Sequence, residues 1–158
     1  MTSEHLLNLY QSEFGLNFTT LRLFNVYGPG QNLDNLKQGM VSIYLKYLLD
    51  DGRIVVKGAL DRYRDFIYVD DVVEVFSQAV NHTTFEGETL NVGTGVMTTV
   101  SALLEKLCQC FGIEDYQSVI DVEGGTPGDQ FGILSSIDRL RNVTECLPLM
   151  PLEIGLQN

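Results

Sequence analysis

The chain has 158 residues, of which 44% are hydrophobic and 20% charged, a composition that is ordinary for a globular domain and argues against disorder. Its net charge is −11 and it has no run of Lys or Arg, so a nucleic-acid or anionic-membrane surface, which needs clustered positive charge, is not expected. No apolar run reaches the roughly 18 residues of a membrane span, and the first residues lack the pattern of a signal peptide. We therefore expect a cytoplasmic location, with Cys108, Cys110 and Cys146 as reduced structural cysteines.

The first predicted elements are a helix and a strand. Apolar residues recur at helical spacing up to Phe14, and Gly15 follows as a stop signal, so a helix is predicted over residues 2–14. Residues 18–24 are rich in Thr, Leu and Phe and predict a strand, which runs toward a loop at the Gly-Pro-Gly of residues 28–30.

The middle of the chain predicts two helices separated by two short strands. In order, they are residues 38–49, 54–56, 64–68 and a helix that starts at Asp70 or Asp71. The first of these helices is nearly apolar, so we expect it to be buried. Asp71 and Glu74 have the spacing of a capping box, in which each side chain satisfies a free backbone N–H of the first turn. Asp70 and Asp71 are therefore interpreted as helix caps rather than as paired catalytic carboxylates.

The last part of the chain predicts a strand, a turn, a helix and then weaker elements. We expect a strand at 89–92, a helix capped by Thr98 or Thr99 that runs to Gly112, strands near 118–122 and 131–134, and a short helix from Ser136. Gly93-Thr94-Gly95 follows a strand as a phosphate-binding turn would, but it lacks a third glycine and does not open a helix directly, so a packed turn is favoured. The alternation of strands and helices predicts an α/β fold.

Three segments carry the strongest functional signal. Residues 21–29, 64–72 and 90–95 are LRLFNVYGP, RDFIYVDDV and LNVGTG, and a late Pro127-Gly128-Asp129 follows. In this order and spacing the chain resembles, over essentially its whole length, the extended short-chain dehydrogenase/reductase family, and within it the NDP-sugar epimerases of the UDP-glucose/UDP-galactose 4-epimerase type.

The resemblance implies the C-terminal half of that fold. We expect a single compact unit over residues 1–158, with the remaining strands of the Rossmann sheet in 1–29 and 65–95. The small mixed α/β substrate-binding part would then comprise 30–64 and 96–158.

Two polar residues match substrate contacts of the family. Asn25 matches a residue that contacts the sugar nucleotide, and an amide can both donate and accept hydrogen bonds; alternatively, it caps the turn before Gly28. Arg64 matches the arginine that binds the substrate diphosphate, because a planar guanidinium fits phosphate oxygens in pairs. The alternative for Arg64 is a surface ion pair with Asp61 or Asp65.

Three apolar residues complete the implied site. Val41 and Val56 lie in segments that flank the nucleotide base in the family, although core packing explains both equally well. Phe24 ends a strand that lies beside the nicotinamide in the family, which makes it the implied cofactor contact. No catalytic residue and no metal ligand is predicted.

The sequence departs from the family at the catalytic motif. The family's Y-x-x-x-K, whose Tyr is the acid/base and whose Lys lowers the pKa of that Tyr, has no counterpart here. Residues 1–4 look like the continuation of that helix beyond the Lys, and the Gly-rich NAD turn is missing as well. The resemblance thus implies NAD in the intact family, but neither NAD binding nor turnover by this chain alone. A non-catalytic NDP-sugar-binding module and a structural remnant of a truncated gene are the alternatives.

The family resemblance also implies a ligand, and the predicted first helix implies a protein partner. A UDP-sugar or another NDP-sugar is the expected ligand, although the arginine that often precedes the late Gly-Asp is replaced by Thr126-Pro127, which leaves Arg62 as a candidate substitute. The apolar stripe of the helix at 2–14 predicts a homodimer or self-association through that helix.

Overall fold

The computed structural model describes residues 2–37, 39–125, 128, 130–144, 147 and 149–158. Its helices are α1 (Thr2–Phe14), α2 (Met40–Asp51), α3 (Val69–Asn81), α4 (Val100–Cys110), α5 (Asp138–Val143) and α6 (Leu152–Gly155), with 3₁₀ turns η1 (Thr83–Phe85) and η2 (Tyr116–Val119). Its strands are β1 (Thr20–Leu23), β2 (Asn25–Tyr27), β3 (Ile54–Lys57), β4 (Tyr63–Arg64), β5 (Phe66–Tyr68), β6 (Thr89–Val92), β7 (Thr98–Thr99) and β8 (Ile120–Glu123). The predicted α/β class is confirmed.

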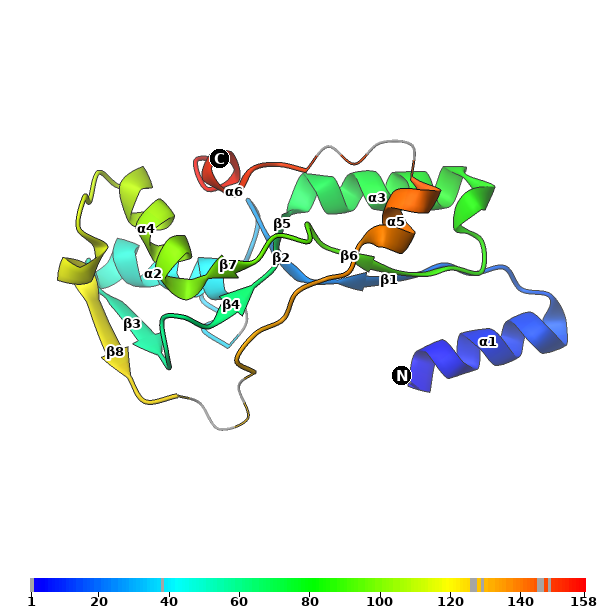
Figure 1. Ribbon diagram of the computed structural model, residues 1–158, viewed down its shortest axis with the longest axis horizontal. Helices are drawn as coiled ribbons and strands as arrows, with labels where there is room; N and C mark the ends of the chain where they lie inside the picture. The colour runs from blue at the N-terminus through cyan, green and yellow to red at the C-terminus, as the bar shows by residue number, and fades with distance from the viewer. Residues whose placement is uncertain (1, 38, 126–127, 129, 145–146, 148) are drawn as a thin grey trace.

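Two regions lie along the long axis of the molecule (Figure 1). In the first, which we call the sheet region, β1 pairs in parallel with β6, and α1, α3 and α5 lie beside this pair. In the second, which we call the lobe, β3 pairs in parallel with β8 beside α2 and α4. The parallel pair β2–β5 and the antiparallel pair β4–β7 lie between the two regions.

Each region has its own apolar core. In the lobe, Ile54 and Val56 of β3 pack with the buried stripe of α4, which includes Leu104. In the sheet region, Leu90 of β6 packs with Val75 of α3. Both cores follow from period-two strands facing helices with apolar stripes. No helix of the described residues is both long enough and apolar enough to cross a membrane.

The strand predicted over residues 18–24 is shorter at its start and continues differently at its end. β1 ends at Leu23, Phe24 donates its N–H to the Val92 carbonyl, and β2 resumes at Asn25 on another partner, β5. The loop therefore begins only at Gly28, where φ is 145°, and Asn25 lies in a strand rather than in a turn.

The capping role predicted for Asp70 and Asp71 is wrong. Helix α3 begins at Val69, and its N-cap, Tyr68, makes no side-chain capping bond. Asp71 lies in the first turn of α3 and accepts the Met150 N–H at 2.8 Å instead, so its carboxylate binds a distant segment rather than its own helix. By contrast, Thr99 caps α4 as predicted, with its Oγ1 accepting the Ala102 N–H at 3.1 Å.

Two other predicted strands are interrupted or absent. The strand expected over residues 64–68 is split into β4 and β5 at Asp65, which faces the protein interior. The strand expected near residues 131–134 is wrong: this segment makes only an isolated parallel bridge between Tyr63 and Gly132.

Helix α1 confirms the prediction for residues 2–14, and it extends from the end of the sheet region (Figure 1). Glu4 fixes it to β1, since its carboxylate accepts from Arg22 Nε at 2.8 Å and Nη2 at 2.6 Å. Leu6, Tyr10 and Phe14 are exposed, with exposed fractions of 51%, 49% and 76%.

Candidate functional site

A cavity of about 690 Å³ opens between β2, α2 and β3, and we call it the cleft. Its lining residues come from segments distant in sequence: Asn25, Leu36, Lys37, Gly39, Met40, Ile43, Tyr44, Tyr47, Val55, Lys57, Arg62, Arg64 and Gly128. The fold thus brings together Asn25 and Arg64, the two polar residues singled out by sequence. It adds two lysines that were not predicted.

A second cavity, of about 580 Å³, lies where β1 and β2 end, and we call it the strand-end cavity. Phe24 and Val41 line it, together with the loop at Gly28. Asn25 and Met40 line both cavities, so the two adjoin. The candidate cofactor contact and one candidate base contact therefore lie next to the cleft rather than inside it.

Asn25 is held in place by the neighbouring strand connection. Its Nδ2 donates to the Asp65 carbonyl at 3.0 Å, and its backbone N–H donates to the same oxygen at 3.1 Å. The amide oxygen is the atom of this side chain suited to accept a ligand hydroxyl.

Arg64 is a largely buried cation at the wall of the cleft, 7% exposed. Its Nη1 donates to the Tyr63 carbonyl at 2.8 Å and to the Phe131 carbonyl at 3.4 Å. These carbonyls orient the guanidinium on the wall. The Asp65 carboxylate points to another part of the molecule, where it binds the turn at Thr94.

Val56 is fully buried in the lobe core, and the structure favours packing for this side chain. Because side chains alternate along a strand, Val55 and Lys57 are the residues of β3 that face the cleft. Residues 54–57 are Ile-Val-Val-Lys, so strand alternation groups Val55 with Lys57 on one face, but the sequence does not show which face meets the cleft.

Arg62 supports its own loop. Its Nε donates to the Ala59 carbonyl at 3.0 Å and its Nη2 donates to the Lys57 carbonyl. The Arg62 guanidinium thus closes the turn after β3.

The late motif of residues 127–129 is described only in part. Gly128 lines the cleft, and Thr126, Pro127 and Asp129 lie outside the described residues.

The Gly93-Thr94-Gly95 turn is packed, as predicted, and it surrounds a buried acid. Asp65 accepts the Thr94 N–H at 2.8 Å and the Gly95 N–H at 2.9 Å. Burial by itself would raise the pKa of the Asp65 carboxyl, but hydrogen bonds from Ser135, Thr94 and Gly95 hold the pKa below its usual range.

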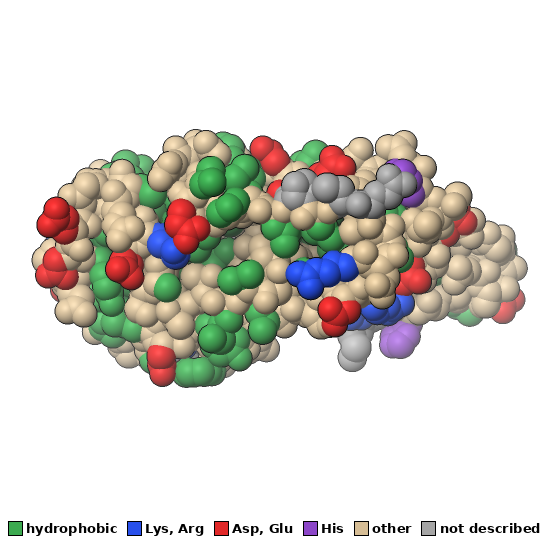
Figure 2. Space-filling model, turned by 45° about the horizontal axis from the view of Figure 1, so that its top comes forward, with side chains coloured by type: hydrophobic (Ala, Val, Ile, Leu, Met, Phe, Trp, Pro, Cys, Tyr) green, Lys and Arg blue, Asp and Glu red, His purple; other side chains and the backbone are tan. Residues whose placement is uncertain are grey.

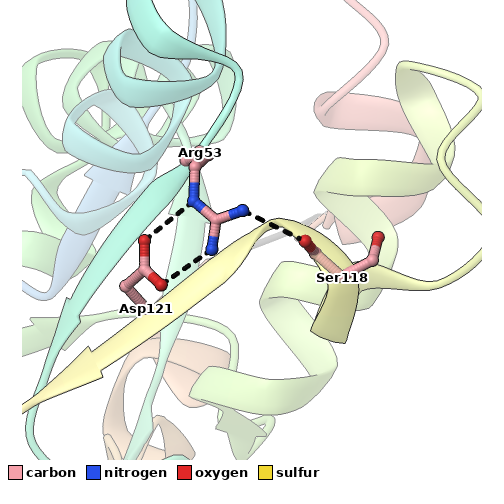
Figure 3. A network of polar contacts seen from close by, with 3 residues as sticks. All are labelled: Arg53, Ser118 and Asp121. Atoms are coloured by element: carbon pink, nitrogen blue, oxygen red, sulfur yellow. Dashed lines mark hydrogen bonds and ion pairs between the residues drawn. The ribbon is translucent and has the colours of Figure 1, made fainter.

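Charge is dispersed on the face of the molecule that Figure 2 shows. On the face seen in Figure 2, basic side chains form small separate groups with acidic side chains near them. Figure 3 shows one such group in the lobe: Arg53 donates to Asp121 from Nε at 2.9 Å and from Nη2 at 2.7 Å, and to the Ser118 carbonyl at 3.4 Å. This ion pair joins the residue before β3 to β8 and does not line the cleft. Within the described ranges, no group of three or more acidic, His or Cys side chains is placed to hold a metal ion.

The chain is similar in sequence to known proteins over more than half of its length. The model of the NAD dependent epimerase/dehydratase family matches residues 1–93. A GDP-6-deoxy-D-talose 4-dehydrogenase of Aggregatibacter actinomycetemcomitans is 35% identical over 67% of this chain and 34% of its own length. A putative UDP-glucose 4-epimerase of Methanocaldococcus jannaschii is 32% identical over 65% of this chain and 32% of its own.

Solved structures give the same result for the fold. The crystal structure of a UDP-glucose 4-epimerase from Thermotoga maritima with UDP-glucose superposes with a TM-score of 0.88 and 29% identity, covering 99% of this chain and 48% of that one. The chain therefore spans about a third to a half of the length of these proteins.

Proposed function

The chain belongs to the NAD dependent epimerase/dehydratase family, and we propose that its cleft binds an NDP-sugar, as the sugar-nucleotide-binding half of a UDP-glucose 4-epimerase-like enzyme. One observation carries this proposal: Asn25 and Arg64, from different strands, line a single cavity of about 690 Å³. A UDP-sugar offers a diphosphate for a guanidinium and sugar hydroxyls for an amide.

The side chains that line the cleft support this proposal. In a chain of net charge −11, Lys37, Lys57, Arg62 and Arg64 all line this one cavity. Their positive charge attracts a diphosphate, while Tyr44 and Tyr47 of α2 offer apolar surface for the base or the sugar. We propose Val55, in place of Val56, as the apolar contact from β3.

The described residues include one proposed contact to NAD but no turn for its pyrophosphate. NAD supplies hydride transfer when it is bound in the family, and Phe24 on the strand-end cavity is our proposed contact to it. The pyrophosphate of a dinucleotide needs a Gly-rich turn that opens directly into a helix. Gly28-Pro29-Gly30 leads into an irregular segment, and the next helix begins only at Met40. The residues present do not fit the whole cofactor, and we derive no hydride step from them.

We propose that these 158 residues bind an NDP-sugar without turning it over. The sequence has no Y-x-x-x-K, and so lacks the phenol that would move the proton in the family's chemistry. The cytoplasm remains the predicted location.

Isothermal titration calorimetry with UDP-glucose tests the proposal. Arg64→Ala should weaken binding by about tenfold or more, because a charged hydrogen-bonding group contributes about 1.5–3 kcal/mol. Arg53→Ala is the matched control: it removes an arginine of the lobe whose partner, Asp121, lies outside the cleft. The absence of binding at millimolar UDP-glucose, or equal losses in both variants, would contradict the proposal.

We further propose that the chain self-associates through α1. Leu6, Tyr10 and Phe14 form an exposed stripe at helical spacing, and such apolar surface favours contact with a second copy. Phe14→Ser together with Leu6→Ser should shift the light-scattering mass toward that of the monomer. The wild-type mass should be compared at about 1 µM and about 100 µM, because association increases with concentration. A wild-type chain that is still monomeric at about 100 µM would contradict this assembly.

A further inference from the structure

Asp65 is the most completely buried acid in the described part of the chain, with 0% exposure, and it lies between β4 and β5. Its Oδ1 accepts the Thr94 N–H at 2.8 Å and the Thr94 Oγ1 hydroxyl at 2.6 Å. Its Oδ2 accepts the Gly95 N–H at 2.9 Å, the Ser135 N–H at 3.2 Å and the Ser135 hydroxyl. A buried carboxylate is costly unless donors surround it, and here five donors do so.

These donors belong to two segments that also contact each other directly, since the Gly95 N–H donates to Ser135 Oγ at 3.3 Å and Asn91 Nδ2 donates to the Ser136 carbonyl at 3.1 Å. Thr94 and Gly95 form the turn after β6, and Ser135 ends the irregular segment 131–135. The site is also tight, because a Cβ on Gly93 would lie 2.8 Å from Asp65 Oδ2 and 2.4 Å from Ser135 Oγ. The carboxylate therefore holds the segment 131–135 against the turn.

Asp65 is connected to two residues that line the cleft, Asn25 and Arg64. Its carbonyl accepts both the Nδ2 and the backbone N–H of Asn25. Its hold on Ser135 places the segment beside β4, where the Phe131 carbonyl accepts from Tyr63 N at 3.2 Å and from Arg64 Nη1 at 3.4 Å. Ile133 N donates to the Tyr63 carbonyl at 3.3 Å and completes the attachment.

We propose that Asp65 is a positioning residue: through Ser135 and the segment 131–135 it sets the direction of the Arg64 guanidinium, and through its carbonyl it sets the Asn25 amide. The effect on ligand binding rests on the proposed function, whereas the orientation of Arg64 does not. Neither Asp65 nor Ser135 lines the cleft, so both act only through other residues.

Two matched variants separate positioning from general support of the fold. Ser135→Ala and Thr94→Val each remove one hydroxyl donor from the same carboxylate. Ser135 belongs to the segment whose Phe131 carbonyl accepts from Arg64, whereas Thr94 belongs to a turn that lies outside the cleft. We expect Ser135→Ala to weaken binding of UDP by about fivefold to tenfold, and Thr94→Val by less than about twofold, with both chains fully folded by circular dichroism. In an Arg64→Ala background, Ser135→Ala should change the UDP affinity no further.

A measurement without ligand distinguishes the positioning role of Asp65 from the proposed binding of an NDP-sugar. The NMR signal of the Arg64 Nε–H should move in Ser135→Ala and stay in place in Thr94→Val. If this pattern is found while the wild-type chain binds no UDP, the proposed function fails and the positioning role stands. If UDP binds and both variants behave alike in affinity and in the Arg64 signal, or if the Ser135 effect persists without Arg64, the positioning role is overturned.

Discussion

Helices α4 and α1 are similar in length, with 11 and 13 residues, yet they use their apolar stripes in opposite ways. The stripe of α4 is 0–2% exposed, and it consists of Val100, Leu103, Leu104, Leu107 and Cys108. The stripe of α1 is 49–76% exposed, and it consists of Leu6, Leu9, Tyr10 and Phe14. An amphipathic pattern thus predicts that a stripe exists, but the partner that covers it must come from elsewhere in the fold or from another chain.

The two helices are also anchored differently. The turn that leads to α4 is held by the buried carboxylate of Asp65, while α1 is held by the exposed pair of Glu4 and Arg22. Buried polar networks resist disruption, whereas exposed ion pairs contribute little. The comparison therefore predicts a graded series of effects on stability.

The largest difference should come from matched leucine truncations. Leu104→Ala removes a fully buried side chain from the lobe core and should lower the free energy of unfolding by about 2–5 kcal/mol. Leu9→Ala, at a 53% exposed position of α1, should change it by less than about 0.5 kcal/mol when the chain is dilute enough to be monomeric. Urea denaturation of the two variants measures both values. Equal losses would mean that α1 is buried in solution, for example by a second copy.

The next largest effect should be a loss of stability at low pH that comes from Asp65. The pKa of Asp65 is lower in the folded chain than in the unfolded one, so as the pH falls the unfolded chain takes up the proton first. The stability that Asp65 contributes is therefore complete above the unfolded pKa of about 3.9 and is lost as the pH falls through the still lower folded pKa. Urea midpoints between about pH 6 and pH 2 should fall with pH in the wild-type chain and less steeply in Asp65→Asn. An unchanged slope would show that the carboxylate is not the anchor.

A smaller effect is expected at the start of α4. Thr99→Ala removes the side-chain cap on the Ala102 N–H and should lower the free energy of unfolding by about 1 kcal/mol. Thr98→Ala, one residue earlier, is the control and should have a smaller effect. The reverse order, measured by thermal unfolding, would place the cap at Thr98.

The smallest effect is expected at the anchor of α1. Its hydrogen bond with Arg22 lowers the pKa of Glu4, but the pair is on the surface and is screened by salt. Glu4→Gln should leave the melting temperature unchanged within error at about 0.5 M salt. A clear loss at high salt would show that α1 is attached by more than this pair.

Sequence patterns predicted most elements, and their failures have a common cause. The Thr99 cap was predicted correctly because capping involves residues only three apart. The Asp71–Glu74 pair had capping-box spacing, but Asp71 binds Met150 instead, and that partner is 79 residues away. For the candidate site, the motifs singled out Asn25 and Arg64, which line one cavity, whereas Val55 and Lys57 could be named only once the structure showed which face of β3 meets the cleft.

The sequence alone determined the α/β class, the helix over residues 2–14, the packed turn at Gly93 and the resemblance to sugar-nucleotide enzymes. These features depend on periodicity, turn glycines and short motifs, all of which act within a few residues. Only the tertiary structure decided that Asn25 and Arg64 share one cleft, that Val56 is core, and that a buried carboxylate joins residues 94 and 135. Hydrogen bonds and packing between distant segments decide these contacts, and no local pattern encodes the partner.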